Sequence, residues 1–380
     1  MKTADRPASA GISSDSHASQ LIARTLRGDL AWVDGEPWDE GAIADDAVSH
    51  GLDLVLWHEL RARRVPADGL IGRLATNVAP EVVRSAVRDR ELARVLERFA
   101  ADRVDCVVLK GAALAHTCYP KPWLRPRLDT DMLVEREAFD RAARVLEDAG
   151  YSRSTTFSTG DFVSHQVAFE RTDRHGVDHT IDLHWRALNP QVLAGIFGFD
   201  VLRDDGMTVE LHGIDLRVPG PLWSLALACA HRLAHHQQQE RLLWLYDIHL
   251  LAGRLVEGDW RRLIRIARER QISAICADGL GRAAGLFATA VPATVLKTLN
   301  DAGRSDPSRR YVERDVRRLE VLRDDLRRLR RWRDRLHLLK EHAFPPAAFM
   351  SNRYGSRSRL FLPLLYAHRL VTGAVRWIRT

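Results

Sequence analysis

The stretch RLDTDMLV, residues 127–134, places two carboxylates in a segment that otherwise has the composition of a buried β-strand. Side chains at positions i and i+2 of a strand point to the same side, so Asp129 and Asp131 are expected to lie next to each other. Like charges that face each other are unfavourable unless a positive group lies between them. The stretch therefore requires a sheet that carries a cation on one face.

A third carboxylate, Asp182, lies in the segment TIDLHW, which also reads as a strand. A neighbouring strand can bring it beside Asp129 and Asp131. Three carboxylates on a rigid sheet form an oxygen site suited to Mg²⁺ or Mn²⁺. His184 shares the side of Asp182, and we expect it to be a neighbouring group of the site or a substrate contact. A hydrogen-bonded core histidine is the alternative interpretation.

Basic residues upstream of this strand are candidates for binding phosphate. The segment LKGAALAH places Lys110 and Gly111 between an expected strand, 104–110, and a short helix, 111–119. A glycine at such a junction lets backbone N–H groups approach phosphate, and the start of a helix favours anions. Arg125 and Arg127, in the proline-containing loop PKPWLRPR, can add charge-assisted hydrogen bonds to phosphate.

The order of helical and strand-like segments predicts an α+β fold with four regions. We expect a disordered tail at 1–19, a helical region at 20–101, a core with a mixed sheet at 102–218, and a helical C-terminal domain at 219–380. In the core, 161–171 and 177–186 alternate as a hairpin, 207–219 forms another around Gly213, and 136–151 forms a helix closed by Gly150.

Bulk properties narrow the class of protein further. The four cysteines form no CxxC pair, which argues against a zinc knuckle and favours a reducing compartment. The first residues have no apolar region typical of a signal peptide, and no run reaches 18 apolar residues, so we expect a cytoplasmic protein without a spanning helix. Residues 360–378 are expected to form a buried helix, or else an interfacial helix with basic anchors.

Residues 309–335 hold twelve arginines and six acidic residues, which places most of the net charge of +7 in one segment. Apolar residues spaced by three and four predict one amphipathic helix over 309–342 that packs on its own domain. A basic face that meets RNA is the alternative.

Two further groups carry ionisable side chains within apolar helices. His231, His235 and His236 lie in HRLAHH, where an i, i+4 pair can bind zinc, although packing or a place beside a cleft is favoured. Asp247 lies in WLYDIHLL, where a buried acid needs a partner. It is a candidate for contact with a nucleotide, or for holding His231 or Arg241.

Several segments taken together resemble a known family. The order of strand, glycine turn, Asp-x-Asp strand and later acidic strand is similar to the nucleotidyltransferase superfamily that includes DNA polymerase beta and kanamycin nucleotidyltransferase. The segments VVLKGAALAHTCYPKPWLRPRLDTDMLV, LEDAGY, IDLHW and LLWLYDIHLLA more closely resemble the bacterial family labelled uncharacterised nucleotidyltransferase, over residues 90–260. The superfamily usually has Gly-Gly or Gly-Ser at the turn. Here Lys110-Gly111 is followed by Ala112, so Lys110 is expected to replace the missing hydroxyl.

The resemblance implies transfer of a nucleoside monophosphate from a nucleoside triphosphate, with ATP expected, to an acceptor. Asp129, Asp131 and Asp182 would hold Mg²⁺ or Mn²⁺, and Asp182 would act near the acceptor as its base. A small molecule or peptide is favoured as acceptor. The alternatives are a toxin-like enzyme that modifies RNA or tRNA, a non-catalytic nucleotide-binding module, and, most distantly, a zinc hydrolase built on the histidines.

Overall fold

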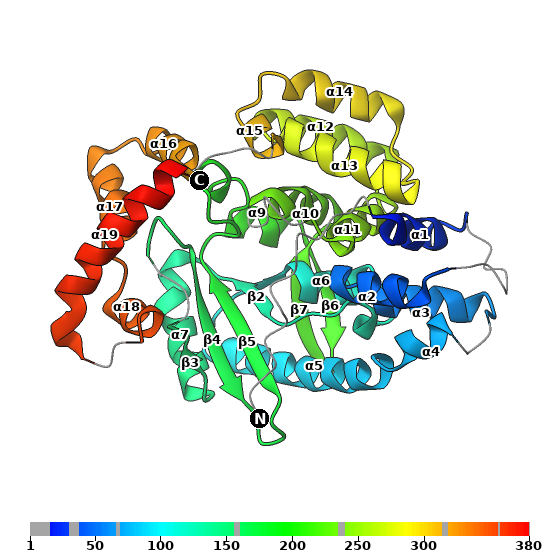
Figure 1. Cartoon of the computed structure of the whole chain (residues 1–380), viewed down its shortest axis with the longest axis horizontal. Coiled ribbons are helices and arrows are strands. Elements are labelled where there is room, and N and C mark those ends of the chain that lie inside the picture. Colours follow the sequence, from blue (N-terminus) through cyan, green and yellow to red (C-terminus); the bar gives the residue numbers. More distant parts are fainter. Residues whose placement is uncertain are drawn as a thin grey trace. The chain divides into compact units, whose positions relative to one another are not determined.

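The computed structural model describes residues 16–29, 38–65, 69–155, 160–234, 240–313, 318–355 and 358–379 (Figure 1). The chain divides into two compact units, each assembled from separated segments. The first unit comprises 1–86, 114–126 and 228–314, and the second comprises 87–113, 127–227 and 315–380. The linear boundaries expected from the sequence stay a prediction.

The second unit contains a five-stranded mixed sheet in the order β1-β2-β5-β4-β3. Its strands are β1 (Val107–Leu109), β2 (Thr130–Leu133), β3 (Ser152–Arg153), β4 (Gln166–Thr172) and β5 (Asp178–His184). The central strands β2 and β5 are parallel, and the other pairs are antiparallel. A separate antiparallel pair is formed by β6 (Gly206–Leu211) and β7 (Ile214–Pro219). The mixed sheet with flanking helices confirms the expected α+β class.

One face of this sheet is the apolar core of the second unit. Leu96 and Phe99 of α5 (Val78–Ala101) and Leu146 of α7 (Phe139–Asp148) pack there with Met132 and Leu183 of the sheet. Because side chains alternate across a strand, Asp131 and Asp182 are directed to the opposite face. The core thus fixes the orientation of both acids.

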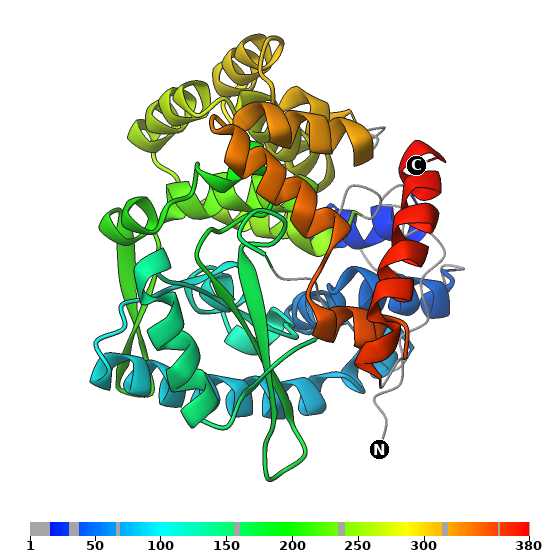
Figure 2. The same ribbon diagram turned by 90° about the vertical axis from the view of Figure 1, so that its left-hand side faces the viewer.

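The expected hairpins are confirmed. Figure 2 shows the long twisted hairpin of β4 and β5. Its turn is closed by Asp173, whose carboxylate accepts hydrogen bonds from the backbone N–H groups of His175 and Val177 at 2.8 and 2.9 Å. The β6–β7 turn contains Gly213 with φ +81°. The short strand β3 was not expected, and α7 ends at Asp148, two residues before Gly150, which has φ +90°.

The first unit is built from helices. They are α1 (His17–Leu26), α2 (Glu40–His50), α3 (Asp53–Ala62), α4 (Leu70–Ala75), η1 (Pro122–Leu124), α11 (Leu242–Ala252), α12 (Glu257–Glu269), α13 (Ser273–Phe287), α14 (Ala293–Gly303) and α15 (Arg309–Val312). Three helices, α5, α6 (Lys110–Thr117) and α10 (Pro221–Ala234), span the segment boundaries between the units.

The remaining helices belong to the second unit. They are η2 (Arg136–Ala138), α8 (Gln191–Ala194), α9 (Phe199–Asp204), α16 (Arg318–Arg328), α17 (Trp332–Ala343), α18 (Ala347–Arg353), η3 (Arg359–Phe361) and α19 (Leu362–Arg379). In this unit α16 contacts α8, and α16, α17 and α18 all contact α19.

The single amphipathic helix expected over 309–342 is wrong. The described parts form three helices, α15, α16 and α17, and the chain leaves helical geometry between Arg328 and Trp332. Arg335 donates to the carbonyl of Leu329 at 2.9 Å and so satisfies a carbonyl that the break exposes. The break also changes which side of α17 faces inward, because Leu338 is buried while Trp332 and Leu336 of the expected stripe are exposed.

Two expectations for the ends of the chain are corrected. The C-terminal helix is not buried along its described side chains, because Leu364 and Leu370 of α19 are exposed. The expected tail at 1–19 extends too far, since Ser16 caps α1 by accepting from the N–H of Ser19, and residues 17–19 are helical. Residues 1–15 lie outside the described part of the chain. Within that part, no helix has the length and apolar character that a membrane crossing requires.

Candidate metal centre

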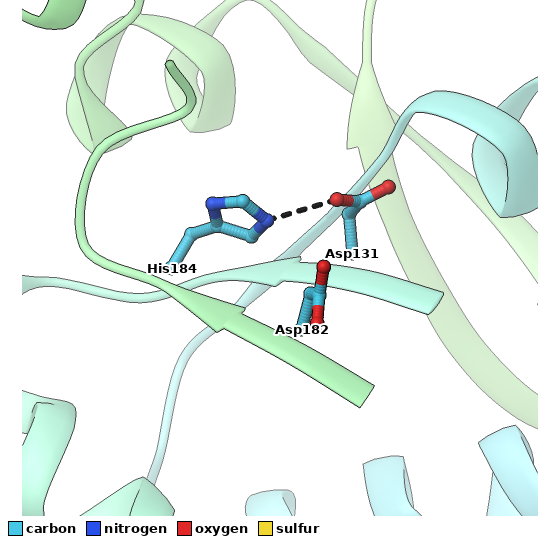
Figure 3. Close-up of side chains that lie close together, drawn as sticks. All are labelled: Asp131, Asp182 and His184. Carbon is cyan, nitrogen blue, oxygen red and sulfur yellow. Dashed lines mark hydrogen bonds and ion pairs between the residues drawn. The ribbon is translucent and has the colours of Figure 1, made fainter. Parts of the chain in front are cut away.

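The centre of the sheet brings two acids and an imidazole together (Figure 3). Asp131 of β2 and Asp182 of β5 are direct Cα partners in the parallel ladder, and His184 follows Asp182 on the same side. One ligand atom from each of these three residues lies within 4.8 Å of the other two. The pairing register of two buried strands therefore places these donors, because a shift by one residue would turn them into the apolar core.

Asp131 is buried and shares one oxygen between two partners. Its Oδ1 accepts from Lys110 Nζ at 2.7 Å and lies 2.8 Å from His184 Nε2. Burial alone would raise the pKa of this carboxyl, but the charge of Lys110 and the hydrogen bond with His184 together hold the pKa well below its ordinary value. Asp131 is therefore a permanent negative charge in this site.

The pKa of Asp182 is shifted in the opposite direction, upwards. Its side chain is partly exposed, and Oδ2 accepts from Gln166 Nε2 at 2.7 Å. Burial, followed by the charges of Asp131 and Asp129, raises the pKa of Asp182 to about 7. Lys110 and the Gln166 hydrogen bond offset only part of this rise. Asp182 can therefore take up or release a proton near neutral pH.

Asp129, the first acid of the Asp-x-Asp pair, lies one residue before β2 and is exposed. Its negative charge contributes to the raised pKa of Asp182. Among the described residues, the compact group of donors consists of Asp131, Asp182 and His184, and Asp129 lies outside it.

Lys110 and Gly111 occupy the junction between β1 and α6, with Lys110 as the first residue of the helix. Lys110 has φ +50°, a left-handed conformation that is costly for a side chain other than glycine. Its ion pair with Asp131 directs the ammonium group into the site.

Arg127 is buried and forms an ion pair with Asp89 of α5. Its Nε and Nη1 atoms are buried and have no hydrogen-bond partner among the described residues. The side chain thus combines an anchoring contact to α5 with unused donors. Asp89 was not singled out in the sequence, because its regular position in a helix gave no signal.

Asp247 lies in the first unit, where it is buried in α11. It accepts from Tyr119 Oη at 2.7 Å and from two nitrogens of Arg125, Nε at 3.0 Å and Nη2 at 2.8 Å. Arg125 and Tyr119 are therefore partners of this acid. Arg125, a candidate for binding phosphate, forms a buried ion pair with this carboxylate.

The histidine cluster is described only in part. His231 of α10 makes an edge contact with the ring of Trp244 at 6.4 Å between ring centroids. His235 and His236 lie outside the described residues, so the structure does not test a zinc site there.

The chemistry of the donor set fits a divalent cation. Asp131 is charged at all ordinary pH values, Asp182 becomes charged near pH 7, and Lys110 supplies one positive charge that a metal ion can replace. Oxygen donors of this kind hold Mg²⁺ or Mn²⁺. Gln166 was missed in the sequence, and only the β4–β5 register, which pairs it with His184, reveals it.

Two comparisons find proteins that are similar to this chain. A family model described as uncharacterised nucleotidyltransferase matches residues 36–288. A search of curated proteins gives no match. A solved structure, an antigenic nucleotidyltransferase-like protein from Paracoccidioides brasiliensis, is 14% identical and has a TM-score of 0.38. That alignment covers 56% of this chain and 94% of the other.

Proposed function

Because the chain belongs to the uncharacterised nucleotidyltransferase family, we propose that it transfers a nucleoside monophosphate from a nucleoside triphosphate to a small molecule or peptide. ATP is the expected triphosphate. The proposal is supported above all by the pairing of Asp131 with Asp182 on adjacent parallel strands, with Lys110 on the same carboxylate.

Asp131 and Asp182 would hold the metal ion, with Asp129 as a further oxygen donor from the exposed end of the strand. Bound Mg²⁺ or Mn²⁺ would neutralise charge on the phosphates and make the acceptor hydroxyl more acidic. The sheet supplies rigidity, because both ligands project from strands whose opposite face is packed in the core.

The reaction requires a proton acceptor at the attacking group. The acceptor oxygen forms a bond to the α-phosphorus, the bond from that phosphorus to the bridging oxygen breaks, and pyrophosphate leaves. The acceptor proton would pass to Asp182, the acid that we expect beside the acceptor.

The triphosphate also needs positive charge. Lys110 is next to the acids, and its ammonium group can exchange Asp131 for a phosphate oxygen once a metal ion neutralises that acid. Gly111 follows at the start of α6, where backbone N–H groups are free of helical partners. Arg127 is a candidate for the triphosphate only if its buried side chain leaves Asp89. His184 supports the acids, and Asp247 is a candidate for the nucleotide only if it exchanges its bonds to Arg125 and Tyr119.

The acceptor class can be tested with a nucleoside triphosphate labelled at the α-phosphate. The protein is incubated with Mg²⁺ or Mn²⁺ and separate pools of small metabolites, peptides and tRNA. We expect label in the first or second pool, which Asp131→Asn abolishes. The matched control, Asp178→Asn, removes an exposed acid of the same strand as Asp182 and should keep full transfer.

Label found only in tRNA would replace the proposed acceptor with RNA, the alternative that the arginine-rich segment suggested. Equal labelling by the wild type and Asp131→Asn would contradict the proposed site. A protein that binds the nucleotide and transfers no label to any pool would be a binding module.

A further inference from the structure

The imidazole of His184 lies where a metal ligand would lie. The ring is fully buried, and its Nε2 is 2.8 Å from Asp131 Oδ1. An octahedral ion with ligands at about 2.1 Å separates adjacent donor atoms by about 3 Å. The observed separation therefore matches two neighbouring ligands of one ion when Nε2 carries no proton.

The third donor is also within reach. One carboxylate oxygen of Asp182 and the ligand atoms of Asp131 and His184 lie within 4.8 Å of one another. Opposite ligands of an octahedral ion lie about 4.2 Å apart, so small side-chain rotations bring the three into one coordination shell. Figure 3 shows the ring and both carboxylates facing a common space.

We infer that His184 is a nitrogen ligand of the metal ion in this site, and that the site therefore selects Mn²⁺ over Mg²⁺. This inference rests on the proposed function. Mg²⁺ prefers oxygen ligands and keeps several waters, whereas imidazole is a ligand of first-row transition-metal ions, the series that begins with Mn²⁺.

His184 must present a bare Nε2 to the ion, so its ring proton resides on Nδ1 in the loaded state. The competing role is to orient Asp131 by donating a hydrogen bond from Nε2. The two roles differ in which atom Nε2 faces, and they predict different spectra.

Pulsed electron paramagnetic resonance of bound Mn²⁺ detects a directly bonded nitrogen. The probe is Mn²⁺ with and without tripolyphosphate, a triphosphate that contains no nitrogen. We expect a nitrogen-14 modulation in the wild type, which disappears when the protein is labelled with nitrogen-15 histidine. The labelled wild type shows whether a histidine nitrogen binds the ion even if a variant fails to fold.

The variant His184→Gln separates the two roles further. Glutamine can still donate a hydrogen bond to Asp131 but offers no imidazole. We expect the nitrogen signal to vanish and the preference for Mn²⁺ over Mg²⁺, measured by competition, to fall about tenfold. The control His179→Gln changes a histidine on the opposite face of the same strand. It should retain the nitrogen signal and the preference for Mn²⁺.

Bound Mn²⁺ without nitrogen modulation, or no bound Mn²⁺ under either condition, would overturn the inference. Neither result requires nucleotide transfer. A nitrogen-bonded ion in a protein that transfers no nucleotide would instead contradict the proposed function and leave the ligand assignment standing.

Discussion

At the scale of single residues, the carboxylate of Asp131 organises the site. The same oxygen serves Lys110 and His184, and Asp182 stands beside it on the next strand. Lys110 thus supplies the positive charge beside Asp131. In the metal-free protein it competes with any incoming cation for Asp131.

Replacing this lysine should strengthen metal binding. In Lys110→Met the competing charge is gone, and we expect affinity for Mn²⁺ in the absence of nucleotide to rise about tenfold, or 1.4 kcal/mol. Titration calorimetry measures this change. The control is Lys340→Met, an exposed lysine of α17. Unchanged or weaker metal binding in Lys110→Met would show that Lys110 does not occupy the position of the metal.

The raised pKa of Asp182 makes stability depend on pH. The folded protein holds a proton on this group up to about pH 7, whereas the ordinary value is 3.8. Its contribution to the free energy of unfolding is complete below pH 3.8 and is lost as pH rises through about 7. Asparagine cannot lose a proton.

We therefore expect Asp182→Asn to match the wild type near pH 4 and to exceed it near pH 8 by on the order of 3 kcal/mol. Urea unfolding with a chelator present, at several pH values, measures the difference. A difference that stays constant across pH would mean that Asp182 titrates normally.

The acids could be predicted because residues two apart in a strand share one face. Lys110 could be predicted because it lies between a strand and a helix, beside a glycine. Asp129, Asp131, Asp182 and Lys110 were all singled out from sequence, although their roles stay predictions. Gln166 and Asp89 could not be found in this way, because each meets its partner only through strand register or helix packing.

At the scale of elements, the ion pair between Arg127 and Asp89 joins the segment before β2 to α5. Both side chains are almost fully buried. Removing one partner of a buried pair leaves an uncompensated charge, which typically costs about 3–5 kcal/mol. The pair therefore holds the Asp-x-Asp strand against the helix that supports it.

We expect Asp89→Asn to lower the free energy of unfolding by about 3 kcal/mol, as measured by urea titration. Glu97→Gln, an exposed acid on the same helix, should change it by less than about 0.5 kcal/mol. Equal small effects of the two changes would show that Arg127 does not depend on Asp89.

Elements with a strict period were predictable, and breaks in them were not. Alternation located β4, β5, β6 and β7, because one side of each strand is apolar. The apolar spacing of 309–342 gave the burial pattern of an unbroken helix, whereas the chain bends between α16 and α17. The spacing of apolar residues does not reveal where a helix breaks, because both halves keep the same spacing.

At the scale of the whole molecule, each unit is assembled from segments far apart in sequence. In the first unit, Asp247 joins α11 to the segment 114–126 through Arg125 and Tyr119. Local periodicity contains no information about such pairing, so the sequence could suggest that Asp247 has a partner but could not identify it.

This cluster should stabilise the first unit. We expect Asp247→Asn to reduce the free energy of unfolding by about 3 kcal/mol, because Arg125 loses its buried partner. Asp301→Asn, an exposed acid of α14, is the control and should have little effect. Chemical denaturation followed by tryptophan fluorescence measures both. A neutral Asp247→Asn would indicate that Arg125 finds its charge partner elsewhere.

The most direct test of the account is to identify which bond of the triphosphate is broken. The protein is incubated with Mn²⁺ or Mg²⁺, a nucleoside triphosphate and the pools of small metabolites and peptides, and pyrophosphate and orthophosphate are measured separately. We expect pyrophosphate together with an acceptor that carries the nucleoside monophosphate, and loss of both products in the double variant Asp131→Asn, Asp182→Asn. Release of orthophosphate with a diphosphate product, or pyrophosphate release that persists in the double variant, would contradict it.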